Sequence, residues 1–415
     1  MTTATTTREQ LRVLRDLAKE VAEIAALPAQ QDKIRLWEKL NGLDPDRPMV
    51  MIDQIPWHEM NVDDELTLRT ADDFYQRLET RLRRTLYKWR HMRADMVVEP
   101  HVDVPKAITG AHLGISAEED RSALDPENDV VGHLYHDQLQ TEEDLEKIKM
   151  PRVTLDEQAT RRAYERAMEA FDGILKVRMQ GMHPSYAFWD RIAEWHGVEA
   201  SLIDLVDRPD FLHKMISRIT TGYHRMLDQL EEKGLLGYPM ATVHCTGAYT
   251  TELPAPGYDP DYVRANDLWT FGMAQIFSSV SPAMHKEFEL DYVYPWYQRF
   301  GLGYYGCCEP LDNKIDVVRT IPNLRKISMS PWVDVRRGAE QIGEDFVFSR
   351  KPSPAFVATD SMDEERVRAD LQEAYDACRA TGTPVEFTLK DISTVRYEPS
   401  RLWRWAEIAK EVVSG

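Results

Sequence analysis

The chain has 415 residues, 43% of them hydrophobic, and a formal net charge of −19 at pH 7. Its 70 acidic side chains would repel nucleic acid and anionic lipid at long range, which leaves small molecules or other proteins as partners. Four cysteines are too few for a disulfide framework, and the sequence has neither a secretory apolar segment nor an apolar run long enough to span a membrane. We therefore expect a protein of the reducing cytoplasm.

The first 45 residues predict a helical arm. From Arg8 to about Leu43 apolar side chains recur at steps of three and four residues with charged residues between them, and Pro28 precedes a second helix from Gln30 to Leu40. This spacing is typical of amphipathic helices. We expect the arm either to cap its own domain or to bind a second copy in a homodimer.

After the arm, short apolar segments alternate with helical patterns such as Ala71 to Asp95. Nine segments are predicted strands: Met49 to Asp53, Met96 to Val104, Gly173 to Met182, Pro239 to Cys245, Met273 to Val280, Leu302 to Cys307, Leu324 to Met329, Asp345 to Ser349 and Pro384 to Leu389. Such alternation favours parallel strands joined by helical crossovers. The sequence predicts an α/β fold, a (β/α)8 TIM barrel over residues 46–415 with an N-terminal helical extension, so one of the nine segments is surplus.

The loops after these strands carry most of the candidate functional residues. In a (β/α)8 barrel the chemistry lies at the carboxyl ends of the strands. The polar, aromatic or metal-capable side chains predicted at these ends are Trp57, His58, His183, His244, Glu287, Cys307, Cys308, Trp332, Arg350, Lys351 and Asp391. We therefore expect a site on this face.

Cys307 and Cys308 make up half of the cysteines in the chain. Neighbouring cysteines rarely form a disulfide with each other, because the bond needs a larger Cα separation than adjacent residues have. They can serve as metal ligands together with Glu287 and His244, since zinc binds Cys, His and carboxylate groups with one position open for chemistry. Each also has a structural explanation: the cysteines as small buried residues, Glu287 as a charge at a helix start, and His244 as a core histidine.

Several segments resemble the uroporphyrinogen decarboxylase superfamily, and more closely its branch of cobamide-dependent methyltransferases and O-demethylase components. The matching segments are Ser281 to Phe288 with Tyr292, Pro295 and Trp296, then Tyr304 to Leu311, Ile321 to Leu324, Ser328 with Pro331, Trp332 and Asp334, and Gly343 to Pro352. They cover roughly residues 270 to 360. The rest of the chain resembles the superfamily only in strand order and in Arg47-Pro48 before the first strand.

The sequence also departs from these families. The decarboxylase has an arginine-rich loop after its first strand, whereas the loop here, Gln54 to Met60, has no arginine, which argues against a tetra-acidic tetrapyrrole substrate. Where the methyltransferases carry His-x-Cys, this chain has Tyr305 and Cys307, and its last strand ends in Lys390-Asp391 with no thiol. A bound metal would therefore need a different ligand set.

The resemblance implies a methyltransferase that takes a methyl group from an ether or similar donor and passes it to the cobalt of a separate corrinoid protein. The sequence has no D-x-H-x-x-G corrinoid motif, so a partner would supply that cofactor. Zinc would assist by binding the departing oxygen. The residues we assign to this site are His244, Glu287, Cys307 and Cys308 as metal ligands, His58, Tyr305 and Asp391 as catalytic groups, and Trp57, His183, Trp332, Arg350 and Lys351 as substrate-binding groups.

Two alternatives stay open. A metal-free decarboxylase or lyase of a small acidic substrate would use Asp53, His58 or Asp391 as acid or base and Arg350 as a carboxylate clamp. A non-catalytic protein would use the same barrel to bind a corrinoid protein or ligand.

Overall fold

The computed structural model describes residues 6–123, 128 and 131–414. Its centre is a six-stranded, entirely parallel sheet, whose strands in spatial order are β1 (Met49–Ile52), β14 (Val385–Leu389), β13 (Val347–Arg350), β12 (Leu324–Met329), β11 (Leu302–Tyr305) and β10 (Trp269–Gly272). Neighbours in this order are successive in the chain except β1, which pairs with the last strand. The predicted α/β class is confirmed.

Four smaller pairs complete the strands described. They are the parallel pair β2 (His101–Pro105) with β7 (Lys176–Gln180), and the antiparallel pairs β3 (Ile108–Thr109) with β6 (Thr154–Leu155), β4 (Glu119–Ser122) with β5 (Gly132–Tyr135), and β8 (Thr242–Val243) with β9 (Thr246–Gly247). Single bridges join Met182 to Leu236 and Tyr186 to Gly272. The segment after β7 thus pairs with Leu236 through Met182 and with the end of β10 through Tyr186.

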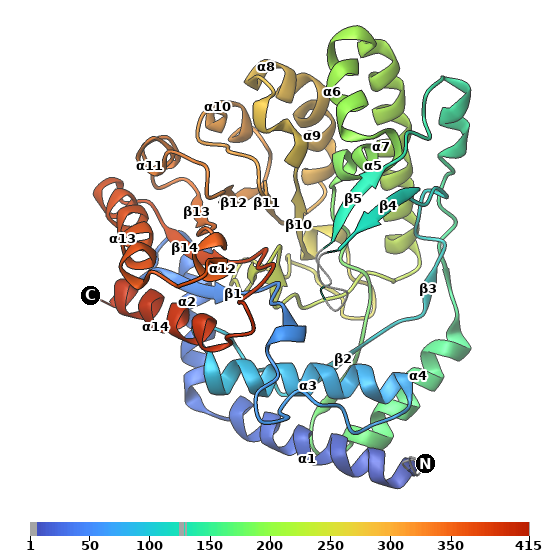
Figure 1. Cartoon of the computed structure of the whole chain (residues 1–415). Helices are drawn as coiled ribbons and strands as arrows, with labels where there is room; N and C mark the ends of the chain where they lie inside the picture. The colour runs from blue at the N-terminus through green and yellow to red at the C-terminus, as the bar shows by residue number, and fades with distance from the viewer. Residues whose placement is uncertain (1–5, 124–127, 129–130, 415) are drawn as a thin grey trace.

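Helices surround the strands, and Figure 1 shows most of them as an outer rim with the main sheet inside. They are α3 (Asp73–His91), α4 (Glu157–Phe171), α5 (Phe188–His196), α6 (Val198–Asp207), α7 (Pro209–Glu232), α8 (Pro282–His285), α9 (Asp291–Tyr297), α10 (Ile315–Val318), α11 (Val335–Ile342), α12 (Ala355–Ala358), α13 (Glu364–Thr381) and α14 (Ser400–Ser414). The main core lies between this rim and the sheet, where strand residues such as Ile327, Phe348 and Phe387 are fully buried. In the part of the chain that is described, no helix is long and apolar enough to cross a membrane.

The predicted arm forms α1 (Thr7–Ala25) and α2 (Pro28–Asn41). A capping box between Thr6 and Glu9 starts α1, because each side chain satisfies a backbone amide of the other residue. α1 packs on α3 and α4, and α2 packs on β1. The arm therefore covers its own chain.

Three strand predictions need correction. The segment Met273 to Val280 is not a strand: residues Gln275–Ser279 form a 3-10 helix, and the strand is the preceding Trp269–Gly272. The chain leaves the sheet after Gly272 because the Ala274 amide donates to Glu309 instead of to a neighbouring strand. Of Pro239 to Cys245 only Thr242–Val243 is extended, as half of a hairpin, and the strand predicted at Met96 begins at His101.

Candidate active site

A thiol and an ammonium group meet at the carboxyl end of the main sheet. Lys390, after β14, donates from Nζ to Sγ of Cys307, after β11, at 2.9 Å. Cys308 Sγ lies 3.4 Å from Cys307 Sγ and 3.6 Å from Oδ2 of Asp391, and this carboxylate lies 3.2 Å from Lys390 Nζ. Four groups from the ends of β11 and β14 thus form one cluster, which we call the Cys307–Lys390 cluster.

The electrostatics of this cluster favour a thiolate on Cys307. The hydrogen bond with Cys308 lowers the pKa of the Cys307 thiol, and the charge of Lys390 lowers it further, which together outweigh the effect of burial. Burial alone would lower the pKa of Lys390, but the Cys307 thiolate and the Asp391 carboxylate raise it instead. The pKa of Cys308 is raised by the hydrogen bond with Cys307 and by burial. The pKa values of the two neighbouring thiols are therefore shifted in opposite directions.

Gly306 allows Cys307 to reach Lys390. Side chains alternate between the two faces of a strand, so Tyr304 faces the inside of the curved sheet and Tyr305 faces the helices. Gly306 then adopts φ +93°, a conformation that favours glycine, and this turns the chain after β11. A Cβ at Gly306 would lie 2.5 Å from Leu311 Cδ1.

The hairpin of β8 and β9 places His244 and Cys245 at its turn. Both have positive φ, 40° and 70°, which non-glycine residues rarely adopt and which proteins often retain at functional sites. Burial lowers the pKa of His244, and the charges of Lys390 and Lys351 lower it further, so its imidazole is neutral. Its Nε2 is buried, and no hydrogen-bond partner is found for it among the described residues.

Cys245, the second residue of this turn, stays a thiol. Burial and the charge of Asp53, at the end of β1, raise its pKa to about 12. The hairpin itself is fixed by Asn41 of α2, whose Nδ2 donates to the carbonyl oxygens of Gly247 and Tyr249 at 3.1 and 2.7 Å. The helical arm thus helps to position the turn.

Below the Cys307–Lys390 cluster, the inside of the sheet holds a fully buried ion pair. Lys326 Nζ of β12 lies 2.7 Å from Oε2 of Glu386 of β14, and the other oxygen of this carboxylate accepts from Ser349 Oγ of β13 at 2.6 Å. Lys351 Nζ donates to the same Ser349 oxygen at 2.9 Å. The charges of Lys326 and Lys351 lower the pKa of Glu386 in spite of its burial. We call Lys326, Ser349, Lys351 and Glu386 the inner cluster. It is a charged group that lies directly beneath the Cys307–Lys390 cluster.

A second polar cluster, the outer cluster, lies between β11 and the helices. Tyr305 donates to Oε2 of Glu289 at 2.8 Å and lies 2.6 Å from Nε2 of His285, and all three side chains are fully buried. Burial raises the pKa of Glu289 well above its ordinary value and lowers that of His285 to about 3. This cluster is therefore uncharged at neutral pH.

The predicted metal ligands do not come together as one set. Glu287 is 57% exposed and lies 3.4 Å from Nε2 of His213 of α7, while Cys307 contacts Lys390. Among the residues that the structure describes, no three His, Cys, Asp or Glu side chains are arranged to hold a metal ion. Zinc binding therefore stays a prediction.

The other predicted site residues have the following surroundings. Asp391 belongs to the Cys307–Lys390 cluster. Lys351 belongs to the inner cluster through its bond with Ser349, and it lies close enough to Lys390 and Cys307 for their charges to act on its pKa. His58 lies 3.6 Å from Glu59, Trp57 packs edge-on against Tyr87, and His183 follows β7.

Two predicted substrate-binding residues have other surroundings. Arg350 is buried and donates to the Ser330 carbonyl at 2.7 Å and to Asp370 of α13 at 2.9 Å, on the helix side of β13. Trp332 is 77% exposed. Arg350 is therefore held by the protein itself rather than directed into the site.

Sequence reasoning placed Lys351 and Lys390 at strand ends but assigned no role to Lys390, and it missed Lys326 and Glu386 as members of the site. The sequence does contain a sign of the inner cluster. Lys326 and Glu386 each interrupt an apolar strand, at positions on the same strand face as Ser328 and Thr388 respectively. Charged residues at the inward positions of a buried strand require a partner, and here each is the other's partner.

No protein-family model matches the sequence, and no curated protein matches it. Among solved structures the chain is similar to a methyltransferase from Methanosarcina mazei, with 12% sequence identity, a TM-score of 0.47, and coverage of 91% of this chain and 97% of that chain. At this TM-score the likeness carries no argument about fold or activity.

Proposed function

We propose that this chain is a cytoplasmic methyltransferase of the cobamide-dependent branch of the uroporphyrinogen decarboxylase superfamily, moving a methyl group from an ether or similar donor to a corrinoid protein. The observation that carries the proposal is the contact of Lys390 with Cys307 at 2.9 Å, at the carboxyl end of the sheet. A charged ammonium group at this place can stabilise an oxygen that leaves with negative charge.

We also propose that residues 46–415 close into a (β/α)8 barrel with residues 1–45 as its helical arm. Supporting this, Cys307 and Lys390 touch although two strands separate β11 from β14, and strands in a flat sheet are about 4.8 Å apart. The sheet must therefore curve strongly. Single bridges continue it beyond β10, and the Asp95 amide donates to Val50 of β1 at 3.0 Å on the other side.

The residues of the cluster would act as follows. As the bond between the methyl carbon and oxygen breaks, the oxygen would keep the bonding electrons, and Lys390, whose charge Cys307 and Asp391 maintain, would stabilise the negative oxygen by donating a hydrogen bond to it. The released oxygen would then take its proton from solvent. The methyl group would pass to the corrinoid of the partner protein, whose cobalt would supply the electron pair for the new bond. The neutral imidazole of His244 lies near Lys351 and Lys390 and would border the substrate.

A lyase acting on a small acidic substrate is the second candidate, and one observation favours it. Two ammonium groups, Lys351 and Lys390, lie at the cluster and lower the pKa of His244 by their charge. Such a pair would bind a carboxylate.

The first experiment is methyl transfer from a panel of methoxybenzoates to cob(I)alamin, followed by the absorbance change of the corrinoid. We expect Lys390→Met to lower the rate at least about a hundredfold, the scale of a lost donor to a developing oxyanion. The matched control is Lys19→Met, an exposed lysine of α1. Release of carbon dioxide from an acidic substrate, without any methyl transfer by the unaltered protein, would favour the lyase instead.

Zinc assistance is tested by the metal content of the purified protein. About one zinc per chain, lost in Cys307→Ala, would support the zinc prediction. The pairing of Cys307 with Lys390 leads us to expect the opposite, because an ammonium group occupies the position from which a metal would bind this sulfur.

A further inference from the structure

Cys307 and Cys308 place two thiol groups side by side at the carboxyl end of the main sheet. Their sulfur atoms lie 3.4 Å apart, and all four cysteines of the chain are free. A disulfide would bring these sulfurs to about 2.05 Å, a geometry that adjacent residues reach only with strain. The pair is therefore an open dithiol, which a single atom can bridge.

The separation of the two sulfurs decides which atom can bridge them. At bonds of about 2.3 Å, the length of a zinc–sulfur bond, an atom joined to sulfurs 3.4 Å apart has an angle of about 95° between its two bonds. Zinc prefers the wider tetrahedral angle. Trivalent arsenic, which has three bonds and a lone pair, prefers an angle close to a right angle. The pair therefore fits arsenic better than zinc.

The surroundings of the pair also favour a ligand without charge. Lys390 Nζ lies 2.9 Å from Cys307 Sγ, and its ammonium group would repel a divalent cation at the same sulfur. An arsenic compound held by two As–S bonds adds no positive charge. A sulfur bonded to arsenic keeps two lone pairs, so Cys307 can still accept the hydrogen bond from Lys390.

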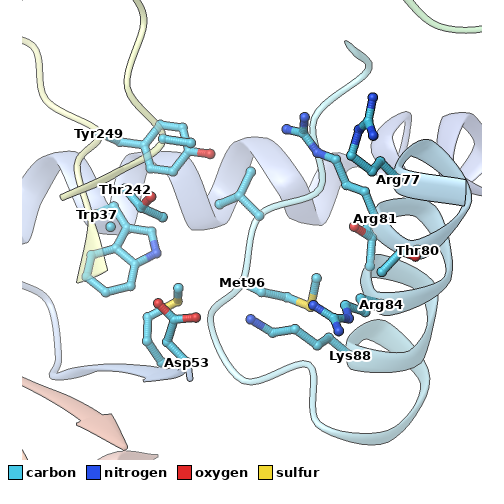
Figure 2. A pocket seen from close by; sticks show the side chains of 15 residues that line it. Trp37, Asp53, Arg77, Thr80, Arg81, Arg84, Lys88, Met96, Thr242 and Tyr249 are labelled. Carbon is cyan, nitrogen blue, oxygen red and sulfur yellow. The ribbon is translucent and has the colours of Figure 1, made fainter. Parts of the chain in front are cut away.

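The other two cysteines offer no such pair. Cys378 is fully buried in α13, and Cys245 lies at the hairpin turn near Asp53. Asp53 lines a cavity of about 550 Å³ together with residues of β1 and α3 (Figure 2), and none of the 15 described residues that line it is a cysteine. A thiol-reactive ligand that entered this cavity would find no pair of sulfurs there.

We propose that Cys307 and Cys308 bind trivalent arsenic compounds as a chelating dithiol. Cys308, which is partly exposed, reacts first, and the buried Cys307 closes the chelate. In each step an As–O bond breaks and an As–S bond forms. The oxygen leaves as water with the proton of the thiol, or with a proton from solvent where the sulfur is already ionised, so nothing is oxidised or reduced.

Chelation should make this binding much tighter than the reaction of a single thiol. The second As–S bond forms within one molecule, which raises affinity by about 10²–10⁴-fold when the two groups are correctly placed. The site lies within the candidate active site, but the binding does not depend on the methyl transfer proposed above.

Intact-mass measurement of the full chain after incubation with phenylarsine oxide tests the proposal. We expect one phenylarsenic group per chain that survives gel filtration. Dithiothreitol should remove it, whereas 2-mercaptoethanol at the same thiol concentration should not, because only a dithiol replaces both As–S bonds with a second chelate. Cys307→Ala and Cys308→Ala should each weaken binding at least about a hundredfold, and 2-mercaptoethanol should then remove the group.

The matched control is Cys245→Ala, which should retain the group. Misfolding would expose Cys378 and add binding, so a loss in the other two variants does not come from structural damage. The proposal fails if the unaltered chain retains no phenylarsenic group, if 2-mercaptoethanol removes the group as readily as dithiothreitol, or if either single variant retains it. Loss in Cys245→Ala would overturn the assignment of the pair, and displacement by an equal concentration of zinc would overturn the argument from the bond angle.

Discussion

The two faces of β11 carry adjacent tyrosines in opposite electrostatic surroundings. Tyr304 points inward, where its hydroxyl lies 3.1 Å from Ser349 in the inner cluster that contains the ion pair of Lys326 and Glu386. Tyr305 points outward to the outer cluster with Glu289. In the inner cluster the opposite charges of Lys326 and Glu386 pair with each other, whereas the outer cluster consists of neutral groups.

This difference shows two ways in which a fold can bury polar groups. Pairing with Lys326 and Lys351 keeps the pKa of Glu386 low, whereas burial raises the pKa of Glu289, because the charge of Lys314 opposes that rise without outweighing it. Only the paired, charged cluster lies under the candidate active site. We expect substitutions in the two clusters to have different consequences.

The largest effect should come from breaking the inner ion pair. Lys326→Met leaves Glu386 buried without its cation and should lower the free energy of unfolding by about 3–5 kcal/mol, measured by urea denaturation. Adding Glu386→Gln should recover part of this loss because it removes the unpaired charge. Lys19→Met, which breaks an exposed pair, should change stability by less than about 1 kcal/mol. A double variant less stable than Lys326→Met would show that the two charges are not coupled.

Gly306→Ala should weaken the link between β11 and the Cys307–Lys390 cluster. Its φ of +93° and the contact with Leu311 should cost about 1–3 kcal/mol, and slower alkylation of Cys307 by iodoacetamide at neutral pH should accompany this loss. Gly173→Ala is the matched control, since Gly173 has φ +77° but nothing within 4 Å of an added Cβ. Equal losses in both variants would mean that backbone strain alone matters.

Tyr305→Phe tests the outer cluster and the prediction that Tyr305 is catalytic. Loss of the hydroxyl leaves Glu289 and His285 without their partner and should cost about 1–3 kcal/mol of unfolding free energy. If Tyr305 only supports the fold, the rate of methyl transfer by the folded variant should stay the same. A lower rate at unchanged stability would establish the catalytic role.

The smallest effect concerns Asp190, near Glu309 and hydrogen-bonded by Gln275 at 3.1 Å. Burial raises its pKa to about 6, and the charge of Glu309 adds to this. The folded state therefore binds this proton more tightly than the unfolded state, so the stabilisation is complete below about pH 4 and is lost as the pH rises through 6. Asp190→Asn should flatten the fall of unfolding free energy over this range. The exposed Asp16→Asn should leave the slope unchanged.

Much of the fold could be predicted because its strands are short apolar segments between amphipathic helices. Leu324 to Met329 was predicted at the bounds found, and the helices of the arm within a few residues. Met273 to Val280 misled because its apolar residues suit a strand and a 3-10 helix equally well. In Trp269–Gly272 large aromatic residues alternate with small ones, and this alternation was the better indication of a strand.

The site was harder to predict because its contacts join strands that are not neighbours. Asp391 and Cys307 were identified from their places at strand ends, but the contact of Cys307 with Lys390 depends on how strongly the sheet curves. Glu287 and Glu289 show a second difficulty: residues Lys286–Leu290 form a π-helical turn, which changes the face that each residue occupies. Spacing in the sequence does not reveal such a turn.

The pairing of the first strand with the last also sets the order of events during synthesis. β1 meets β14 only when nearly all of the chain has left the ribosome, and Gln54 then accepts from the Asp391 amide at 3.1 Å. Until that moment one edge of β1 has no strand partner, and α2 of the arm is already available to shield it. The contact between Cys307 and Lys390, which helps to lower the pKa of this thiol, therefore forms only at the closing step of folding.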